Sequence, residues 1–228
     1  MNFDDDDVPV KIADYRRMQA AIPGVDGFYR LLGAIGGVCF PAGGRVLVVG
    51  AGGGRELETL GSDPKGFSFL AVDPSSQMLA VARTFAEAAG CLDRTTFLQG
   101  EVFDVPGSAG PFDAATSLLV MHFLADDGAK LAYLKAIREH LKPGALYVHA
   151  DTSFDDAATF ERLEPVFLRH AELAGLSPDD MAVWPSIIAD APIIGEARTL
   201  DLFRQAGFVQ PTPYFRGLWY RGWLCIAA

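Results

Sequence analysis

The sequence predicts an α/β fold, a mostly parallel β-sheet with helices on both of its faces. Short apolar segments alternate with segments of helical pattern between residues 44 and 151. The segment 46–49 is apolar throughout, as expected for a strand that is covered on both sides. Glycines at positions 50 and 52–54 follow this strand, which indicates a ligand site at the carboxyl end of the sheet.

The N-terminal part is predicted to be helical after a solvated run of aspartates at residues 4–7. A helix over residues 8–22 places Tyr15, Met18 and Ile22 on one face. Residues 22–27 contain one proline and two glycines, so they end this helix. Residues 28–40 form a second apolar segment, which we expect to be a helix weakened by glycine.

Five strands and three helices are predicted between residues 44 and 151, and their alternation implies parallel strand pairing. Ser75 or Ser76 can cap the second of these helices, Gly90 can end it, and Lys142-Pro143-Gly144 closes the third. The strands are expected at residues 46–49, 68–73, 95–100, within 112–120, and at 145–151, and the helices at residues 55–60, 75–90 and 129–141.

The pattern changes after residue 151. Two or three helices are expected over residues 152–206, one of them capped by Ser177. Two antiparallel strands around a turn at Arg216-Gly217 are expected in the last segment, because their connection is short. We expect one domain, 1–228, made of N-terminal helices or a lid (1–43), a ligand-binding core (44–151), a helical cap (152–206) and a C-terminal hairpin (207–228).

The composition of the chain limits the classes of binding partner and the cellular compartment that we expect. Half of the 228 residues are apolar, enough for a sizeable core, and the formal net charge of −10 disfavours nucleic acid. No run approaches the ~20 apolar residues of a membrane span, and the acidic N-terminus is unlike a secretory signal. Cys39, Cys91 and Cys225 are far apart, which predicts buried free thiols in a reducing compartment. We therefore expect a cytoplasmic location and no contact with a membrane.

The spacing of the glycines restricts the ligand. A dinucleotide fingerprint, G-x-G-x-x-G, would need a third glycine where this chain has Arg55. The spacing G-x-G-x-G is met by Gly50, Gly52 and Gly54. That spacing suits an adenosine with a compact, uncharged or zwitterionic tail, since no diphosphate has to be held. A tight strand-to-helix turn without a ligand is the alternative interpretation.

Two acidic residues at the ends of predicted strands strengthen the ligand hypothesis. The carboxylate of Asp73 can accept hydrogen bonds from both hydroxyls of a ribose, or it can serve as a turn aspartate before Pro74. Glu101 can accept the exocyclic amine of adenine while Val102 covers the ring, or it can be a solvated loop residue. These elements follow successive strands, so together they favour an adenosyl ligand.

The segments "VLVVGAGGGREL", "AVDPSSQML", "FLQGEVFDVP", "FDAATSLLVMHFL" and "LKPGALYVHAD" resemble the class I S-adenosylmethionine-dependent methyltransferases over residues 44–151. The resemblance implies a Rossmann-like sheet of seven strands whose last strand is antiparallel, with S-adenosylmethionine as the methyl donor. It also implies a set of cofactor-binding residues: Gly50, Ala51, Gly52, Gly54, Asp73, Pro74, Met78, Glu101, Val102, Ser117 and Leu118.

One departure from this family leaves alternatives open. The family often carries an acidic residue two positions before the first glycine, where this chain has Val48. A non-catalytic protein that binds S-adenosylmethionine or a nucleoside is therefore an alternative. Both ends of the chain also resemble bacterial transferases that modify wobble uridine in transfer RNA with a carboxylated cofactor. Their reaction needs a cation, and the corresponding segment "VWPSIIAD" has no arginine or lysine.

Methyl transfer from a sulfonium requires mainly alignment, and a general base only for a hydroxyl or protonated amine. His122, His149 and Asp151 are the candidate bases, and His122 is the predicted catalytic residue because it follows the fourth strand. His149 fits a core position better, and Asp151 can simply cap a turn. The histidines are scattered, which predicts no metal site. Aromatic residues in the cap favour a small organic acceptor, and the expected state is a monomer or a homodimer.

Overall fold

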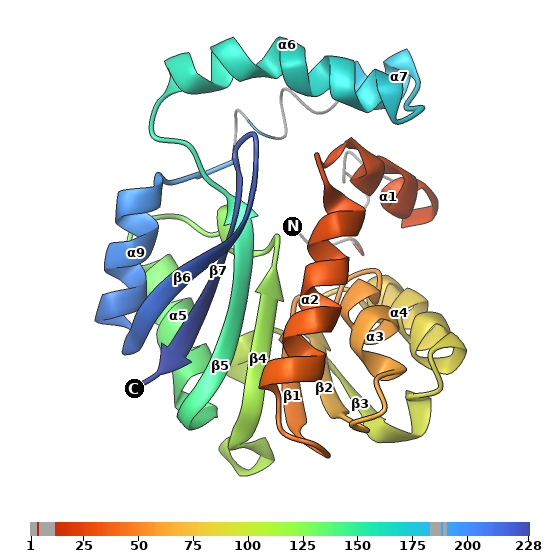
Figure 1. The fold of residues 1–228 in the computed structure, drawn as a ribbon, viewed down its shortest axis with the longest axis vertical. Coiled ribbons are helices and arrows are strands. Elements are labelled where there is room, and N and C mark those ends of the chain that lie inside the picture. The colour runs from red at the N-terminus through yellow and green to blue at the C-terminus, as the bar shows by residue number, and fades with distance from the viewer. Residues whose placement is uncertain (1–3, 5–11, 183–187, 189–190) are drawn as a thin grey trace.

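A computed structural model describes residues 4, 12–182, 188 and 191–228, and these residues form a seven-stranded mixed sheet with helices on both sides. The strand order is β3-β2-β1-β4-β5-β7-β6 (Figure 1). The strands are β1 (Arg45–Val49), β2 (Ser68–Asp73), β3 (Thr95–Gln99), β4 (Phe112–Leu118), β5 (Leu141–Thr152), β6 (Phe208–Gly217) and β7 (Tyr220–Ala227).

The first five strands, β1, β2, β3, β4 and β5, pair in parallel with one another in the order β3-β2-β1-β4-β5, as the alternation of strands and helices predicts. Val46 of β1, for example, lies opposite Phe69 of β2 on one side and Ala114 of β4 on the other. β7 is antiparallel to both of its neighbours, β5 and β6, and pairs Trp223 with His149. The antiparallel last strand implied by the family resemblance is therefore confirmed.

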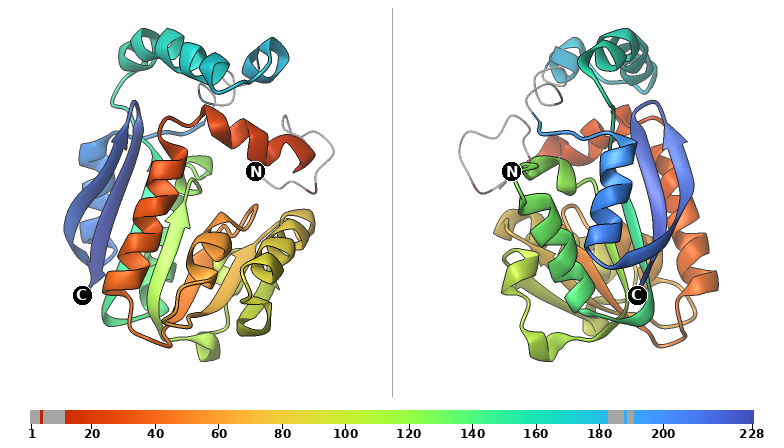
Figure 2. Two further views of the ribbon diagram at one scale, coloured as in Figure 1. Left: turned by 45° about the vertical axis from the view of Figure 1, so that its right-hand side comes forward. Right: turned by 90° about the vertical axis from the view of Figure 1, so that its left-hand side faces the viewer.

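Helices cover the two faces of the sheet. α2, α3 and α4 lie on one face, and α5 and α9 lie on the other (Figure 2). The helices are α1 (Ile12–Met18), α2 (Val25–Cys39), α3 (Arg55–Gly61), α4 (Ser76–Ala88), α5 (Ala129–Glu139), α6 (Ala157–Leu173), α7 (Pro178–Ala182) and α9 (Glu196–Gln205).

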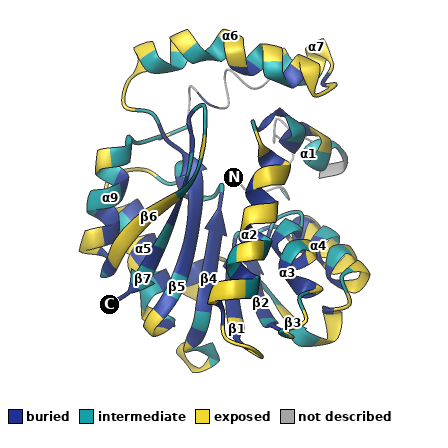
Figure 3. Ribbon diagram, viewed as in Figure 1, coloured by how far each residue is buried: buried dark blue, intermediate teal, exposed yellow. Residues whose placement is uncertain are grey.

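The hydrophobic core is divided by the sheet into two layers. Successive strand residues point to opposite faces, so Val46 and Val48 pack towards α2 and α3, whereas Leu47 and Val49 pack towards α5. The central strands are buried almost throughout (Figure 3). This burial explains why the segment 46–49 has no polar residue.

Two predicted boundaries are wrong because strand pairing extends further than the sequence pattern indicates. β5 begins at Leu141, which pairs with Phe112, so Lys142-Pro143-Gly144 lies within the strand and α5 ends before it. In the C-terminal hairpin of β6 and β7, Arg216 and Gly217 still pair with β7. The turn therefore lies at residues 218–219, two residues beyond the predicted place.

The predicted helical cap is split between two places. α6 and α7 lie over the carboxyl ends of the parallel strands, whereas α9 packs against α5 and β6 (Figure 1). Ser177 caps α7 as predicted, because its hydroxyl accepts the N–H of Asp180 at 3.2 Å. Most of "VWPSIIAD" lies outside the described residues, as does the predicted start of the N-terminal helix before residue 12. Across the described residues, no helix is long and apolar enough to cross a membrane.

Asp4 is partly exposed, as the sequence predicts, but it is held in place by hydrogen bonds. Its carboxylate accepts hydrogen bonds from the Ser75 hydroxyl (2.7 Å) and from the N–H groups of Ser76 (2.7 Å) and Gln77 (3.1 Å) at the start of α4. The first turn of a helix leaves N–H groups unpaired and attracts anions, which explains this contact.

The prediction of buried thiols is wrong for Cys39, which is exposed at the end of α2.

Candidate functional site

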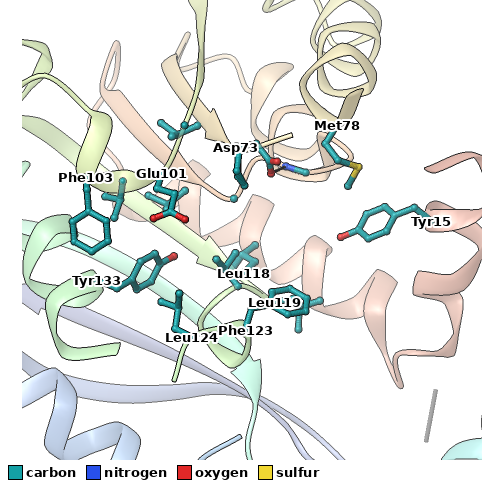
Figure 4. A pocket seen from close by; sticks show the side chains of 18 residues that line it. Tyr15, Asp73, Met78, Glu101, Phe103, Leu118, Leu119, Phe123, Leu124 and Tyr133 are labelled. Carbon is teal, nitrogen blue, oxygen red and sulfur yellow. Dashed lines mark hydrogen bonds between the residues drawn. The ribbon is translucent and has the colours of Figure 1, made fainter. Parts of the chain in front are cut away.

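A cavity of about 130 Å³ lies at the carboxyl ends of β1, β2 and β4 (Figure 4). It forms where the sheet order places the ends of these neighbouring strands side by side. The cavity brings together eight of the residues that the sequence predicts to bind a cofactor: Gly50, Gly52, Asp73, Pro74, Met78, Glu101, Val102 and Leu118.

Main chain rather than side chains forms the wall of the cavity after β1. Gly50 has a φ of +72°, and a Cβ atom built there would lie 2.3 Å from the Val120 side chain. Gly52 has a φ of +44°, which favours glycine as well. The N–H groups of Gly50 and Ala51 both donate to the carbonyl of Val72 at 2.9 Å, which holds the loop against β2. The loop can therefore approach a ligand closely.

Asp73 ends β2 and connects the glycine loop to α4. One carboxylate oxygen accepts the N–H of Gly52 at 2.8 Å, and the other accepts the N–H of Ser75 at 3.0 Å. Burial raises the pKa of Asp73, while these two N–H groups act to lower it. Each carboxylate oxygen offers about two lone pairs, so each keeps one for a further donor. Asp73 thus serves as a turn residue and still has the capacity to bind two vicinal hydroxyls.

Glu101 and Val102 follow β3 on another side of the cavity. Glu101 is exposed, and its N–H donates to Asp104 at 2.8 Å, which orders the turn. Val102 is buried and presents an apolar surface. Met78 approaches from the first turn of α4, where its N–H donates to the Ser75 hydroxyl at 3.1 Å. The cavity thus combines apolar walls with carboxylates, although the assigned roles of these residues remain predictions.

Three predicted residues do not line the cavity. Ala51 is buried in the core. Gly54 begins α3 and packs against α4, since a Cβ atom there would come within 2.8 Å of Ala82. Ser117 does not itself border the cavity, but it shares a hydrogen bond of 2.6 Å with the hydroxyl of Tyr133, which does. The structure therefore places Ser117 behind the cavity wall, next to Tyr133, and its role at the cofactor stays a prediction.

Several lining residues were missed by sequence reasoning. Tyr15 reaches the cavity from α1, and Tyr133 reaches it from α5 (Figure 4). Both lie on the inner face of an amphipathic helix, which predicts burial but gives no indication of which space the ring borders. The remaining missed residues belong to connections: Gly100, Phe103, Leu119, Val120, Phe123 and Leu124, together with Val49 and Val72 at the strand ends.

His122 lies beside the cavity in a short helical turn, Met121–Phe123, and is paired with Asp151 at the end of β5. Its ring Nδ1 contacts one carboxylate oxygen of Asp151, and its main-chain N–H donates to the other at 3.0 Å. Burial alone would raise the pKa of Asp151, but the charge and hydrogen bonding of His122 bring the pKa below its usual value. Asp151 therefore orients the ring, a role that the sequence could not separate from that of a turn residue.

His149, the second candidate base, is a core residue. It is fully buried within β5, and its Nδ1 lies 3.0 Å from the Tyr147 hydroxyl. Burial lowers the pKa of His149 to about 4, so the ring is neutral at pH 7. Its Nε2 has no hydrogen-bond partner among the described residues. The core interpretation of His149 is confirmed.

Val48 packs in the core, and the first carboxylate after the glycine loop is that of Glu56 in α3. Glu56 is 3% exposed, and burial raises its pKa to about 8. The neighbouring Arg55 stacks on the ring of Tyr29, 4.2 Å from its centroid, and donates to Asp26 at 3.0 Å. The charged pair that follows the glycines is thus directed into the interface between α2 and α3.

Comparisons with known proteins agree with this arrangement. Residues 46–144 match the family described as methyltransferase domain. An uncharacterized protein of Synechococcus sp. is 29% identical over 163 residues, which cover 71% of this chain and 38% of that protein. The chain thus spans well under half the length of this curated relative.

Solved structures with a similar fold include methyltransferases. An O-methyltransferase family protein of Burkholderia thailandensis has a TM-score of 0.66 at 14% identity, covering 89% of this chain and 56% of that chain. A protein of Thermotoga maritima described as a SAM-dependent methyltransferase has a TM-score of 0.60 at 17% identity, covering 95% and 96% of the two chains. At these identities the likeness shows a shared fold. The match to the methyltransferase domain family extends over residues 46–144, which include most of the residues that line the cavity.

Proposed function

We propose that this chain transfers a methyl group from S-adenosylmethionine to a small organic acceptor. The observation that carries the proposal is that bare main chain at Gly50 and Gly52 and the carboxylates of Asp73 and Glu101 border one cavity. An adenosyl ligand needs these features together: a close backbone approach, an acceptor for two ribose hydroxyls and an acceptor for an amine.

The residues present fit this cofactor. A side chain at Gly50 would collide with Val120, which also lines the cavity, so glycine lets these two parts of the wall lie close together. Asp73 would hold the ribose with its remaining lone pairs, Glu101 would accept the adenine amine, and Val102 and Met78 would cover the ring. S-adenosylmethionine, when bound, supplies a methyl group that is already activated on a sulfonium. The chain has to align the acceptor and exclude water, and positioning of this kind supplies on the order of 7–11 kcal/mol.

His122 is proposed as the residue that takes a proton from a hydroxyl or ammonium acceptor. With Nδ1 held by Asp151, the ring has Nε2 left to accept the proton. Asp151 then stabilises the charged ring, because a buried carboxylate favours a neighbouring cation. His122 is part of the turn that places Phe123 in the cavity wall, which puts the ring close to the proposed reaction centre.

We infer the class of methyl acceptor from the net charge of the chain and from the aromatic residues of the cap region. The net charge of −10 makes an RNA acceptor unfavourable, and the aromatic side chains of the cap region favour a small organic molecule. We propose that the protein acts in the cytoplasm as a monomer or homodimer, in line with its free cysteines.

Calorimetric titration with S-adenosylmethionine, S-adenosylhomocysteine and NAD tests cofactor binding. We expect the first two to bind and NAD not to bind, because Arg55 stands where a dinucleotide loop has its third glycine. Binding of NAD alone would overturn the proposal.

Methyl transfer to a panel of phenols, amines and carboxylic acids tests catalysis. Formation of S-adenosylhomocysteine that depends on the acceptor supports an enzyme. Cofactor binding without turnover across the panel would favour the non-catalytic binding protein. Turnover on transfer RNA alone would contradict the small-molecule acceptor.

A further inference from the structure

Lys130 of α5 is a lysine without exposed surface. Lysine is almost never fully buried, because its ammonium loses water that protein groups have to replace. The Nζ atom of Lys130 donates to the main-chain carbonyl of Met121 at 2.7 Å. Burial lowers the pKa of Lys130, while the carboxylates of Asp151 and Asp126 act to raise it. Packing alone would favour an apolar residue at this core position, so packing does not explain the lysine.

The carbonyl that Lys130 contacts belongs to the short helical turn Met121–Phe123, which follows β4. The same carbonyl also accepts the N–H of Leu124 at 3.1 Å, so it has a partner without the lysine. The turn places Phe123 in the cavity wall and carries His122 next to it. The contact with Lys130 therefore adds a tie between this turn and α5, and the hydrogen bonding within the turn does not depend on it.

Separate contacts join the same turn to β5. Asp151 accepts the N–H of His122 at 3.0 Å and contacts the ring Nδ1. The N–H of Leu119, just before the turn, donates to the carbonyl of Ala150 at 2.8 Å. Leu119 has a φ of 62°, a conformation that persists only where the surroundings impose it. The turn is thus held by two elements, by β5 through Asp151 and by α5 through Lys130.

α5 borders the proposed site at a second place as well. Lys130 and Tyr133 are both buried and three positions apart, so they lie on one face of this helix. Tyr133 lines the cavity, and its hydroxyl is fixed by Ser117 at 2.6 Å. One helix face therefore supplies part of the cavity wall directly and fixes the turn of His122 relative to that wall.

We propose that Lys130 is a positioning residue, which holds the turn Met121–Phe123 so that His122 and Phe123 keep their places at the cavity. The inference rests on the proposed function, because it assigns His122 a part in methyl transfer. It explains why the core contains a charge that costs stability: the site gains a fixed base in return. Lys130 lies outside the cavity lining, so its role concerns the transfer step rather than cofactor affinity.

Lys130→Met removes the charge and the donor but keeps a side chain of similar length, and Lys135→Met, at an exposed position of the same helix, is the matched control. Turnover is measured with an acceptor that the wild type methylates, taken from the panel of phenols, amines and acids. We expect kcat of Lys130→Met to fall roughly 10- to 100-fold, the cost of displacing a reacting group by up to about 1 Å. The affinity for S-adenosylhomocysteine, measured by calorimetry, should stay unchanged. A kcat equal to that of Lys135→Met would overturn the proposal.

Urea denaturation separates positioning from a structural role of Lys130. A structural role predicts that Lys130→Met is less stable than the wild type. Positioning predicts equal or greater stability, because methionine removes a buried charge and the carbonyl of Met121 keeps the N–H of Leu124. Loss of stability together with loss of affinity for S-adenosylhomocysteine would contradict the positioning role.

Amide hydrogen exchange of His122 tests the turn without any acceptor. This N–H donates to Asp151, so it exchanges only when the turn opens. We expect exchange to be about tenfold faster in Lys130→Met, the factor for losing one hydrogen bond from a charged donor, and unchanged in Lys135→Met. Equal rates in both variants would overturn the inference. If exchange is faster but the wild type methylates no acceptor, the proposed function fails while the tie through Lys130 stands.

NMR of the wild-type chain tests the contact without relying on a variant. A buried ammonium that donates to the carbonyl of Met121 should give a slowly exchanging ¹H–¹⁵N signal for Lys130. Fast exchange of these protons with water would contradict the contact, even if Lys130→Met did not fold.

Discussion

Asp73 illustrates how one side chain serves the loop and the proposed ligand together. Its two oxygens accept N–H groups from both sides of the cavity wall, which explains its burial in spite of its charge. Burying a charge without such partners would be costly. The residue types at positions 50, 73 and 101 could be read from the sequence because each follows a strand. The partners of Asp73 could not, since they depend on the path of the chain between β2 and α4.

Replacement of Asp73 by asparagine is expected to weaken cofactor binding. An amide has one oxygen, so it cannot accept from both main-chain donors and from two hydroxyls as well. Hydrogen bonds to charged groups contribute about 1.5–3 kcal/mol, which corresponds to a loss of roughly 10- to 100-fold in affinity for S-adenosylhomocysteine. Calorimetry measures the change, and Asp93→Asn, at an exposed position in the short helical turn Leu92–Arg94, is the control. Equal affinities in the two variants would show that Asp73 does not bind the ribose.

Glu56 should make stability fall as the pH rises. Its pKa is raised to about 8 in the folded chain, against an ordinary value of 4.5, so the folded state holds a proton that the unfolded state has lost. The contribution is fully present below pH 4.5 and disappears towards pH 8, an effect of at most about 5 kcal/mol. Glu56→Gln should remove this dependence in urea denaturation at pH 5 and pH 8.5. Glu87→Gln, at an exposed position in α4, should retain it.

At the scale of elements, the glycine loop shows what a sequence pattern can and cannot determine. Continuous apolar segments mark β1 and β2 as strands that are buried on both faces, and the glycines mark the loop, so the position of the cavity could be predicted. Ser117 does not border the cavity directly but is paired with the hydroxyl of Tyr133, a partner that the sequence could not indicate. Tyr15 and Tyr133 were missed because α1 and α5 reach the cavity only after the helices have packed onto the sheet.

Gly50→Ala tests the loop against a matched position. Gly50 and Gly66 have similar φ angles of +72° and +70°, so alanine carries the same backbone cost at both positions. A Cβ atom at Gly50 meets Val120 at 2.3 Å, whereas one at Gly66 meets no atom within 4 Å. Gly50→Ala should therefore be less stable than Gly66→Ala by about 1–3 kcal/mol, the typical cost of overpacking. Urea denaturation measures the difference, and comparable stabilities would show that the loop has room to adjust.

At the scale of the whole molecule, strand β5 connects the proposed site, at its end, with the hydrophobic core around its middle. His149 lies in the middle of β5, between the pair of His122 with Asp151 and the layer that holds Tyr147 and Trp223. The sequence predicted a buried histidine here because both neighbours along the strand are apolar. It could not predict that a second imidazole, that of His122 in the turn after β4, would contact Asp151, because this contact requires the assembled sheet.

The buried His149 should destabilise the protein in mild acid. Its pKa is lowered to about 4, so between pH 6.5 and pH 4 the unfolded chain binds a proton that the folded chain does not. Stability should therefore fall with pH across this range by about 3 kcal/mol. His149→Gln should show a smaller fall in thermal unfolding at pH 7, 5.5 and 4.5. His170→Gln, on α6, serves as the control and should match the wild type; an unchanged slope in His149→Gln would contradict the assignment.

The position of β7 between β5 and β6 affects how the chain can fold during its synthesis. Residues 208–217 have no neighbour to pair with until residues 220–227 have left the ribosome, because β7 separates β6 from the rest of the sheet. Until that moment β5 presents an unpaired apolar edge, which is a site for association with other nascent chains. Translation that stalls before residue 227 should therefore yield an aggregation-prone product.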